Sequence, residues 1–149
     1  MRCVLLLALA GLSAPLAASA APQDAFGVWL TANREAAIEV QPCGGSVCGR
    51  LLWYLEKRSG PDAGLDSKNP SPENRSRRLC GLAMLGGFKP SATGWEGGWV
   101  YDPESGNTYS GTIEPDGPDR LKLRGYVGIP LFGRTEVWTR APADQRRCG

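Results

Sequence analysis

Short runs in which apolar and polar side chains alternate cover most of the chain from residue 26 onward. A period of two is the pattern of a β-strand with one buried face. Glycine, proline, asparagine and aspartate separate the runs, which indicates turns and loops between strands. We predict eight strands, at residues 26–31, 38–41, 49–55, 81–85 with Phe88, 95–101, 108–114, 121–127 and 134–140.

Mostly sequential strands of this number and length favour a small antiparallel barrel. Closure is expected because it leaves no strand edge unpaired. The predicted fold class is therefore all-β, an eight-stranded antiparallel barrel, with a β-sandwich as the alternative.

Residues 56–78 interrupt the pattern between the third and fourth strands, and we call them the insert. They contain Gly60-Pro61, Asn69-Pro70 and a basic cluster that ends at Arg78. A structureless segment of this length is unusual inside a compact domain. The insert is therefore expected either to pack across one mouth of the barrel or to form a short helical turn at residues 70–76.

The eighth strand can be oriented in two ways. With Val137 toward the core, Arg134, Glu136, Trp138 and Arg140 form an exposed outer face of ion pairs. With the opposite register, the barrel interior is polar and contains arginine. We favour the first orientation, since burying several guanidinium groups requires partners that offset their desolvation.

The N-terminus has the pattern of a secretory signal peptide. Arg2 precedes an apolar run at residues 4–12, and Ala18-Ser19-Ala20 provides a cleavage site. The apolar run is about half the length that a membrane-spanning helix needs. We predict cleavage after Ala20, a periplasmic or secreted location, and no transmembrane segment in the mature chain. Residues 21–149 then form one barrel domain, with 141–149 as a flexible tail.

The charge balance argues against nucleic acid as a partner. The 17 basic and 15 acidic residues are interspersed along the chain. Proteins that bind nucleic acid or an anionic membrane surface concentrate one sign of charge, and the sequence as a whole shows no such concentration.

Four of the five cysteines remain once the signal peptide is removed: Cys43, Cys48, Cys80 and Cys148. An even number in an exported chain indicates disulfides, and three pairings are possible. Cys43 and Cys48 enclose a segment suited to a hairpin turn, so we favour a bridge between them. Cys80 to Cys148 then follows by exclusion. A metal site is disfavoured because the chain has no histidine and the spacing matches no zinc pattern.

The absence of histidine also excludes a Ser-His-Asp triad and a Cys-His pair. The glycine pairs are not phosphate loops, since no helix follows them. Carboxylates, lysine, tyrosine and cysteine remain as catalytic groups, and a carboxylate pair such as Asp102 with Glu136 would be one route to a hydrolase. We identify no catalytic, cofactor-binding or metal-binding residue and expect a protein that is not an enzyme and needs no cofactor.

Motifs spread over residues 27–140 resemble one family. They are G-x-W at 27–29, C-G-G-S-V-C-G-R-L at 43–51, K-N-P at 68–70, R-R-L-C-G at 77–81, G-G-F at 86–88, W-x-G-G-x-V-Y-D-P from 95, G-N-T-Y from 106, and L-K-L-R-G-Y-V-G-I-P-L-F-G-R-T-E-V-W-T-R at 121–140. The sequence resembles the bacterial exported proteins grouped as domain of unknown function 2147. That resemblance implies an exported bacterial protein, and it brings no reaction or site residues.

A second, weaker resemblance is to lipocalins, which begin with G-x-W and carry an arginine on the last strand. Trp29 and Arg140 occupy those places. The resemblance implies a lipocalin-like barrel in which Arg140 stacks on Trp29 as a structural lid, a cation–π contact of ~1 kcal/mol.

Our first functional hypothesis is a barrel that binds a small amphipathic or apolar molecule, or an envelope component. Trp53 is expected to line its cavity together with Trp99 and Tyr101, which share one face of the fifth strand with Trp95 and Gly97. The insert would gate that cavity. The alternatives are a structural or interaction module with a filled core and, third, the carboxylate-dependent hydrolase.

Overall fold

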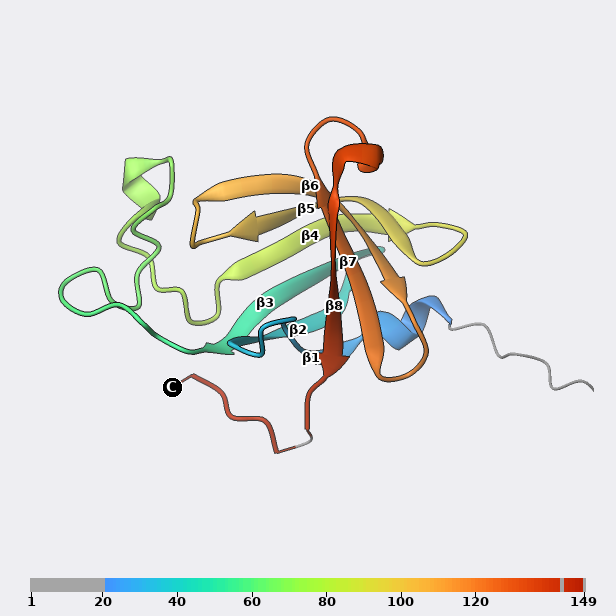
Figure 1. Ribbon diagram of the computed structural model, residues 1–149, viewed down its shortest axis with the longest axis horizontal. Coiled ribbons are helices and arrows are strands. Elements are labelled where there is room, and N and C mark those ends of the chain that lie inside the picture. The colour runs from blue at the N-terminus through green and yellow to red at the C-terminus, as the bar shows by residue number, and fades with distance from the viewer. Residues whose placement is uncertain (1–20, 143, 149) are drawn as a thin grey trace, which may run out of the picture.

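The computed structural model describes residues 21–142 and 144–148. Within these residues, eight antiparallel strands follow one another around a closed barrel, and β1 pairs with β8 to complete it (Figure 1). The predicted barrel is confirmed, and the sandwich alternative is wrong. The expected signal peptide lies outside the described residues. The strands are β1 Gly27–Leu30, β2 Ala36–Cys43, β3 Ser46–Tyr54, β4 Ala83–Pro90, β5 Trp95–Asp102, β6 Asn107–Pro115, β7 Arg120–Tyr126 and β8 Arg134–Arg140.

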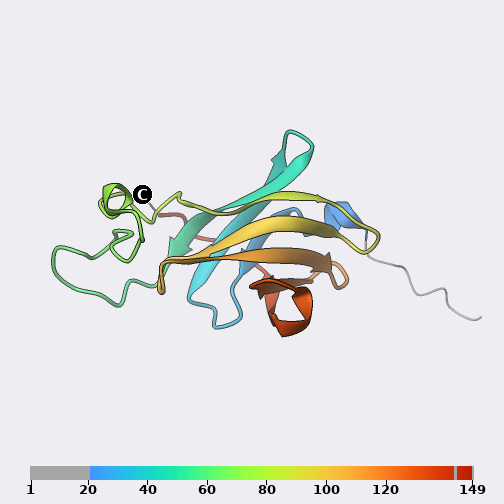
Figure 2. The ribbon, with the colours of Figure 1, turned by 90° about the horizontal axis from the view of Figure 1, so that it is seen from above.

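The two ends of the barrel differ in how they are covered. Because consecutive strands are antiparallel, alternate connections lie at opposite ends. One end carries the short β2–β3, β4–β5 and β6–β7 connections and the 3₁₀ turn η1 (Pro22–Ala25), and we call it the closed end. The other, which we call the open end, carries the β1–β2 and β5–β6 turns, the insert, and the β7–β8 loop with the 3₁₀ turn η3 (Pro130–Phe132). Figure 2 shows the insert extending beyond the strands.

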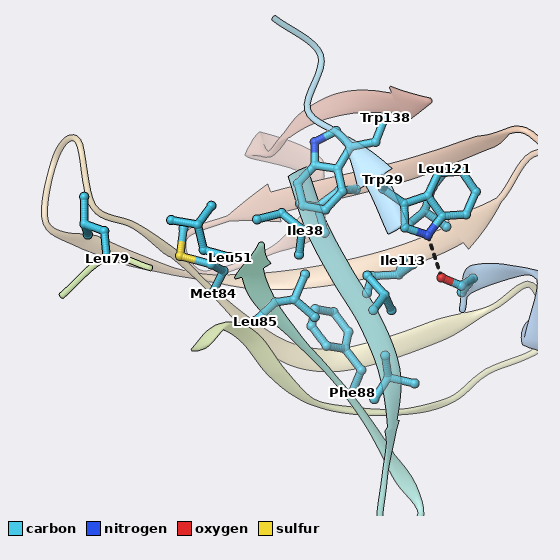
Figure 3. Packing of buried hydrophobic residues seen from close by; sticks show 14 residues of the cluster. Trp29, Ile38, Leu51, Leu79, Met84, Leu85, Phe88, Ile113, Leu121 and Trp138 are labelled. Carbon is cyan, nitrogen blue, oxygen red and sulfur yellow. Dashed lines mark hydrogen bonds between the residues drawn. The ribbon is translucent and has the colours of Figure 1, made fainter. Parts of the chain in front are cut away.

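Apolar side chains fill the closed end. Trp29 and Phe88 are fully buried, and Trp29 Nε1 donates a 2.8 Å hydrogen bond to the carbonyl oxygen of Ala25 in η1 (Figure 3). A Cβ at Gly98 would lie 2.3 Å from the Phe88 ring, so a residue without a side chain is required there. Each large buried apolar side chain stabilises the fold by roughly 1.5–3 kcal/mol. The cluster also includes Ile38, Val40, Val47, Leu51, Leu85, Ile113, Leu121, Leu123 and Trp138.

Arg140 seals this end from outside. Its guanidinium carbon lies 4.1 Å from the centroid of the Trp29 ring, the contact expected from the lipocalin resemblance. The same group donates hydrogen bonds to the carbonyl oxygens of Pro118 at 2.6 Å, Phe26 at 3.0 Å and Asp24 at 2.9 Å. One side chain therefore links β8, the β6–β7 turn and η1.

The insert has little regular structure. The expected helical turn is the 3₁₀ turn η2, Pro72–Asn74, and a single β-bridge joins Leu65 to Arg78. Leu55 joins the insert to β3, and residues 79–82 join it to β4.

A buried carboxylate attaches the insert to the barrel. Asp66 has no exposed surface and accepts hydrogen bonds from Asn69 Nδ2 at 2.9 Å, Arg77 Nε at 2.8 Å and the Tyr101 hydroxyl. Burial and the hydrogen bond to Asp66 raise the pKa of Tyr101. Since Tyr101 belongs to β5, this network fixes the insert against the outer side of that strand.

Two disulfides cross-link the described part of the chain. Cys43 is bonded to Cys48 within the β2–β3 hairpin, with their Cα atoms 5.8 Å apart. Cys80 is bonded to Cys148, which joins the segment just after the insert to the C-terminal segment. These are the pairings that the sequence favoured.

The C-terminal segment, expected as a flexible tail, has contacts in its described part. The Cys148 amide donates a 2.7 Å hydrogen bond to the carbonyl oxygen of Leu52. The Arg146 guanidinium lies 4.4 Å from the centre of the Trp53 ring. These contacts and the Cys80 bridge hold the described part of the segment against the outer face of β3.

Candidate ligand cavity

A cavity of about 1160 Å³ occupies the barrel interior toward the open end. Its deeper wall is apolar, because the inward positions of several strands carry aliphatic or aromatic side chains there. These include Ile38, Leu51, Met84, Val100, Leu123 and Trp138. The interior is therefore packed at the closed end and hollow at the open end, so the core is not completely filled.

Charged side chains surround the mouth of the cavity. Lys57 forms an ion pair with Glu35, and Arg58 Nε lies 3.2 Å from a carboxylate oxygen of Glu56. Lys68 reaches across to the β5–β6 turn, where its ammonium donates a hydrogen bond to the carbonyl oxygen of Glu104. The cavity thus has an apolar wall and a polar, partly charge-paired rim.

Glu56 is held in its charged form. Burial acts to raise its pKa, but hydrogen bonds from the backbone amides of Arg58 and Gly64, and the Arg58 guanidinium, outweigh burial and lower the pKa to about 2. Next to it, burial and the Glu56 carboxylate raise the pKa of Tyr54. The carboxylate therefore fixes the start of the insert at the cavity rim.

Two charged residues of β8 line the cavity. The favoured orientation of the eighth strand is wrong: Val137 is 40% exposed on the outside and Trp138 is only 5% exposed. Arg134 and Glu136 lie along the cavity with Trp138. The desolvation argument fails here because the cavity is open to solvent, and both charged residues are exposed.

The expected carboxylate pair shares this cavity. Asp102 lies at its rim and Glu136 on its wall, where Glu136 accepts a 3.1 Å hydrogen bond from Trp138 Nε1. That bond ties Glu136 to the apolar wall.

Of the three expected lining residues, Trp53 and Trp99 do not line the cavity, and Tyr101 borders it only at the open end. Val100 takes the inward position of β5, and the Tyr101 hydroxyl bonds Asp66 of the insert on the outer side. Trp53 belongs to an outer cluster with Leu30, Ala37 and Leu52. A β-bulge is the reason. Ala37 pairs with Trp53 and Ile38 with Leu51, so Leu52 is an extra residue in β3. Strict alternation from Leu51 would turn Trp53 inward, and the extra residue turns it outward.

A second bulge displaces Trp99. The register of β5 against β6 shifts between Glu96 and Gly98, and Gly97 has φ = +69°. The expected common face of Trp95, Gly97, Trp99 and Tyr101 is therefore interrupted at Gly97: Trp99 and Tyr101 share the outer face, where both line a small pocket, and Trp95 does not. Trp95 packs against the core, and Trp99 lies on the outer face, 39% exposed.

Met84, Leu123 and Tyr109 also line the cavity, although they are not among the residues predicted from the sequence. For Leu123, a signal exists, because alternation in β7 places it on the same side as Leu121. For Met84 and Tyr109, no sequence pattern distinguishes a lining residue from a packed one.

These features define a lipocalin-like barrel, packed at one end and with a ligand-sized cavity at the other. The chain belongs to the family described as an uncharacterised protein conserved in bacteria, domain of unknown function 2147, whose model matches residues 27–140. The chain therefore belongs to a bacterial protein family, as the sequence motifs implied.

A solved structure has the same fold. Protein HP1028 from the human pathogen Helicobacter pylori, described as belonging to the lipocalin family, matches with a TM-score of 0.67 at 20% sequence identity. The match covers 79% of this chain and 83% of that chain. At this identity the likeness shows the fold alone. The comparison with curated proteins found no match.

One further property concerns membranes. Among the residues that the structure describes, no helix has the length and apolar character needed to cross a bilayer.

Proposed function

We propose that this protein is exported from the bacterial cytoplasm and binds a small amphipathic molecule in the cavity of its barrel. The observation that carries the proposal is the division of the cavity into an apolar wall and a charged rim. An apolar tail would contact Leu51, Met84 and Leu123, and a polar group would face the rim.

The size of the cavity supports this proposal. Ligand pockets are commonly about 300–1,000 Å³ and are mainly apolar, with a few polar groups that orient the ligand. A volume of about 1160 Å³ is large enough for a single-chain amphiphile. Arg134 and Glu136 supply one charge of each sign inside the cavity.

Two observations support export. Two disulfides join residues within 21–142 and 144–148, and such bonds persist in oxidising compartments and are rare in the cytoplasm. The expected signal peptide at residues 1–20 gives the same destination. The periplasm or the medium is the location that we propose.

Native mass spectrometry of protein purified without detergent tests the proposal. The expected result is an added mass that disappears on organic extraction and belongs to a molecule with an apolar chain. In parallel, the stripped protein should bind 1-anilinonaphthalene-8-sulfonate, an amphipathic fluorescent probe, at one site.

A cavity-filling variant makes this test specific. Gly125 lines the cavity, and a Cβ there would meet the Tyr109 side chain at 3.6 Å, an ordinary contact. Gly125→Leu should therefore fold and bind the probe more weakly. Lys122→Leu adds the same side chain to the outer face of the same strand and should bind it normally. Equal binding by both variants would place the probe outside the cavity and contradict the proposal.

A further inference from the structure

An exposed apolar loop lies beside the cavity mouth. Residues 127–132, which we call the apolar loop, connect β7 to β8. Four of its side chains are largely exposed: Val127 at 73%, Ile129 at 51%, Leu131 at 76% and Phe132 at 79%. Figures 1 and 2 show η3, which forms part of this loop, projecting from the barrel. So dense a group of exposed apolar side chains marks a surface that meets another apolar phase.

The apolar loop is held in this projecting position. Arg124 donates hydrogen bonds to the carbonyl oxygens of Pro130 at 2.8 Å and Leu131 at 3.4 Å, and to Thr135 Oγ1 at 2.8 Å. The Gly133 amide also donates to the carbonyl oxygen of Pro130 at 3.0 Å. These hydrogen bonds hold the backbone carbonyl groups of the loop on the side facing the barrel. Its apolar side chains therefore point away from the barrel.

Basic side chains accompany the apolar loop. On β7, Lys122 and Arg124 alternate with the buried Leu121 and Leu123, so the basic residues share the outer face. Residues 120–140 contain five basic residues and one acidic residue, but Arg134 lines the cavity and Arg140 covers Trp29. Arg120, Lys122 and Arg124 remain on the outer face of β7, where Asp116 is paired with the first two. Three cations against one carboxylate leave a local excess of positive charge on this face.

We propose that the apolar loop inserts into the surface of an anionic phospholipid bilayer while the basic outer face of β7 contacts the headgroups. A small projecting loop with apolar tips and flanking cations matches the boundary between headgroups and acyl chains. Charge complementarity favours this occupant over a second copy of the chain, because two copies would bring the same basic faces together. Val127 and Phe132 also line the cavity, so the docked mouth would open toward the lipid.

Vesicle flotation tests this inference without reference to the cavity ligand. Purified protein with an N-terminus defined by mass spectrometry should float with mixed phosphatidylcholine–phosphatidylglycerol vesicles and much less with pure phosphatidylcholine vesicles. Added salt should weaken the binding. Leu131→Asp should weaken it roughly tenfold or more, because an inserted apolar side chain is replaced by a charge. Lys122→Gln should weaken it roughly fivefold.

Trp99→Asp is the control, because Trp99 is an exposed apolar residue, at 39%, on the outer face of β5, away from the apolar loop and the cavity lining. It should float like the unchanged protein. Equal losses in Leu131→Asp and Trp99→Asp, or no binding to the anionic vesicles, would overturn the inference. So would a dimer in size-exclusion chromatography that Leu131→Asp dissociates, since the loop would then meet a second copy. Probe binding that survives in Leu131→Asp would keep the proposed cavity function separate from this result.

Discussion

Single side chains hold together parts of this barrel that are distant in the sequence. Arg140 contacts η1, the β6–β7 turn and the Trp29 ring, and it lies at the end of the last strand. A charged donor that satisfies several backbone carbonyls contributes more than an exposed ion pair does.

We expect Arg140→Gln to lower the free energy of unfolding by about 2–3 kcal/mol, because carbonyl contacts and the cation–π contact are lost together. Chemical denaturation measures this. Arg120→Gln, which removes an exposed ion pair with Asp116, should cost under about 1 kcal/mol. Similar losses in both variants would contradict the role assigned to Arg140.

Glu56 makes stability depend on pH in a defined window. Its folded pKa of about 2 lies below the ordinary value of 4.5, so the unfolded chain takes up the proton first as pH falls. The stability that the carboxylate contributes is complete above about pH 4.5 and is lost as pH falls toward 2.

The free energy of unfolding of the unchanged protein should therefore exceed that of Glu56→Gln near neutral pH, and the two values should converge between pH 4.5 and about 2. Denaturant titrations at several pH values measure the difference. Curves that stay parallel through this window would show that the carboxylate charge does not hold the insert.

At the scale of elements, irregular pairing decides which residues the cavity contains. The two bulges, at Leu52 in β3 and Gly97 in β5, each add one residue, and each turns a tryptophan outward. Alternation predicts faces correctly only while the register is regular. Hence the strands could be predicted from the sequence, and the orientation of Trp53 and Trp99 could not.

The two disulfides should contribute unequally. In the chain-entropy view, closing a loop with a sequence separation of 68 stabilises by about 4 kcal/mol, and one with a separation of 5 by about 2 kcal/mol. Replacing Cys80 and Cys148 together by serine should therefore lower the midpoint of thermal unfolding more than replacing Cys43 and Cys48. Calorimetry under oxidising conditions compares them, and the reverse order would show that native-state contacts outweigh loop closure.

For the whole molecule, the position of each tryptophan allows the cavity to be probed directly. Trp138 lines the cavity, and Trp99 lies on the outer face. A brominated single-chain amphiphile quenches only tryptophans that it nearly touches.

Bound in the cavity, this amphiphile should quench the fluorescence of the unchanged protein, and Trp138→Phe should remove most of that quenching. Trp99→Phe should leave it intact. Fluorescence titration of the three proteins makes the comparison. If the loss followed Trp99 instead, the amphiphile would bind outside the barrel.

The local pattern of the chain was sufficient for several conclusions. Alternating apolar positions and turn residues determined the number and order of the strands within the described residues, and the barrel follows because closure pairs every edge. The motifs determined the family, and the spacing of Cys43 and Cys48 favoured their bridge. All of these depend on neighbours in sequence, or on a single global requirement such as closure.

The content of the cavity was decided only by the tertiary structure. Whether Arg134 and Glu136 face inward depends on the register of β8 and on whether water reaches the interior, and neither is encoded in alternation alone. Asp66 becomes a buried anchor only when the insert meets Tyr101 of β5. Burial and solvent access arise from the packing of segments distant in sequence, so a local pattern does not specify them.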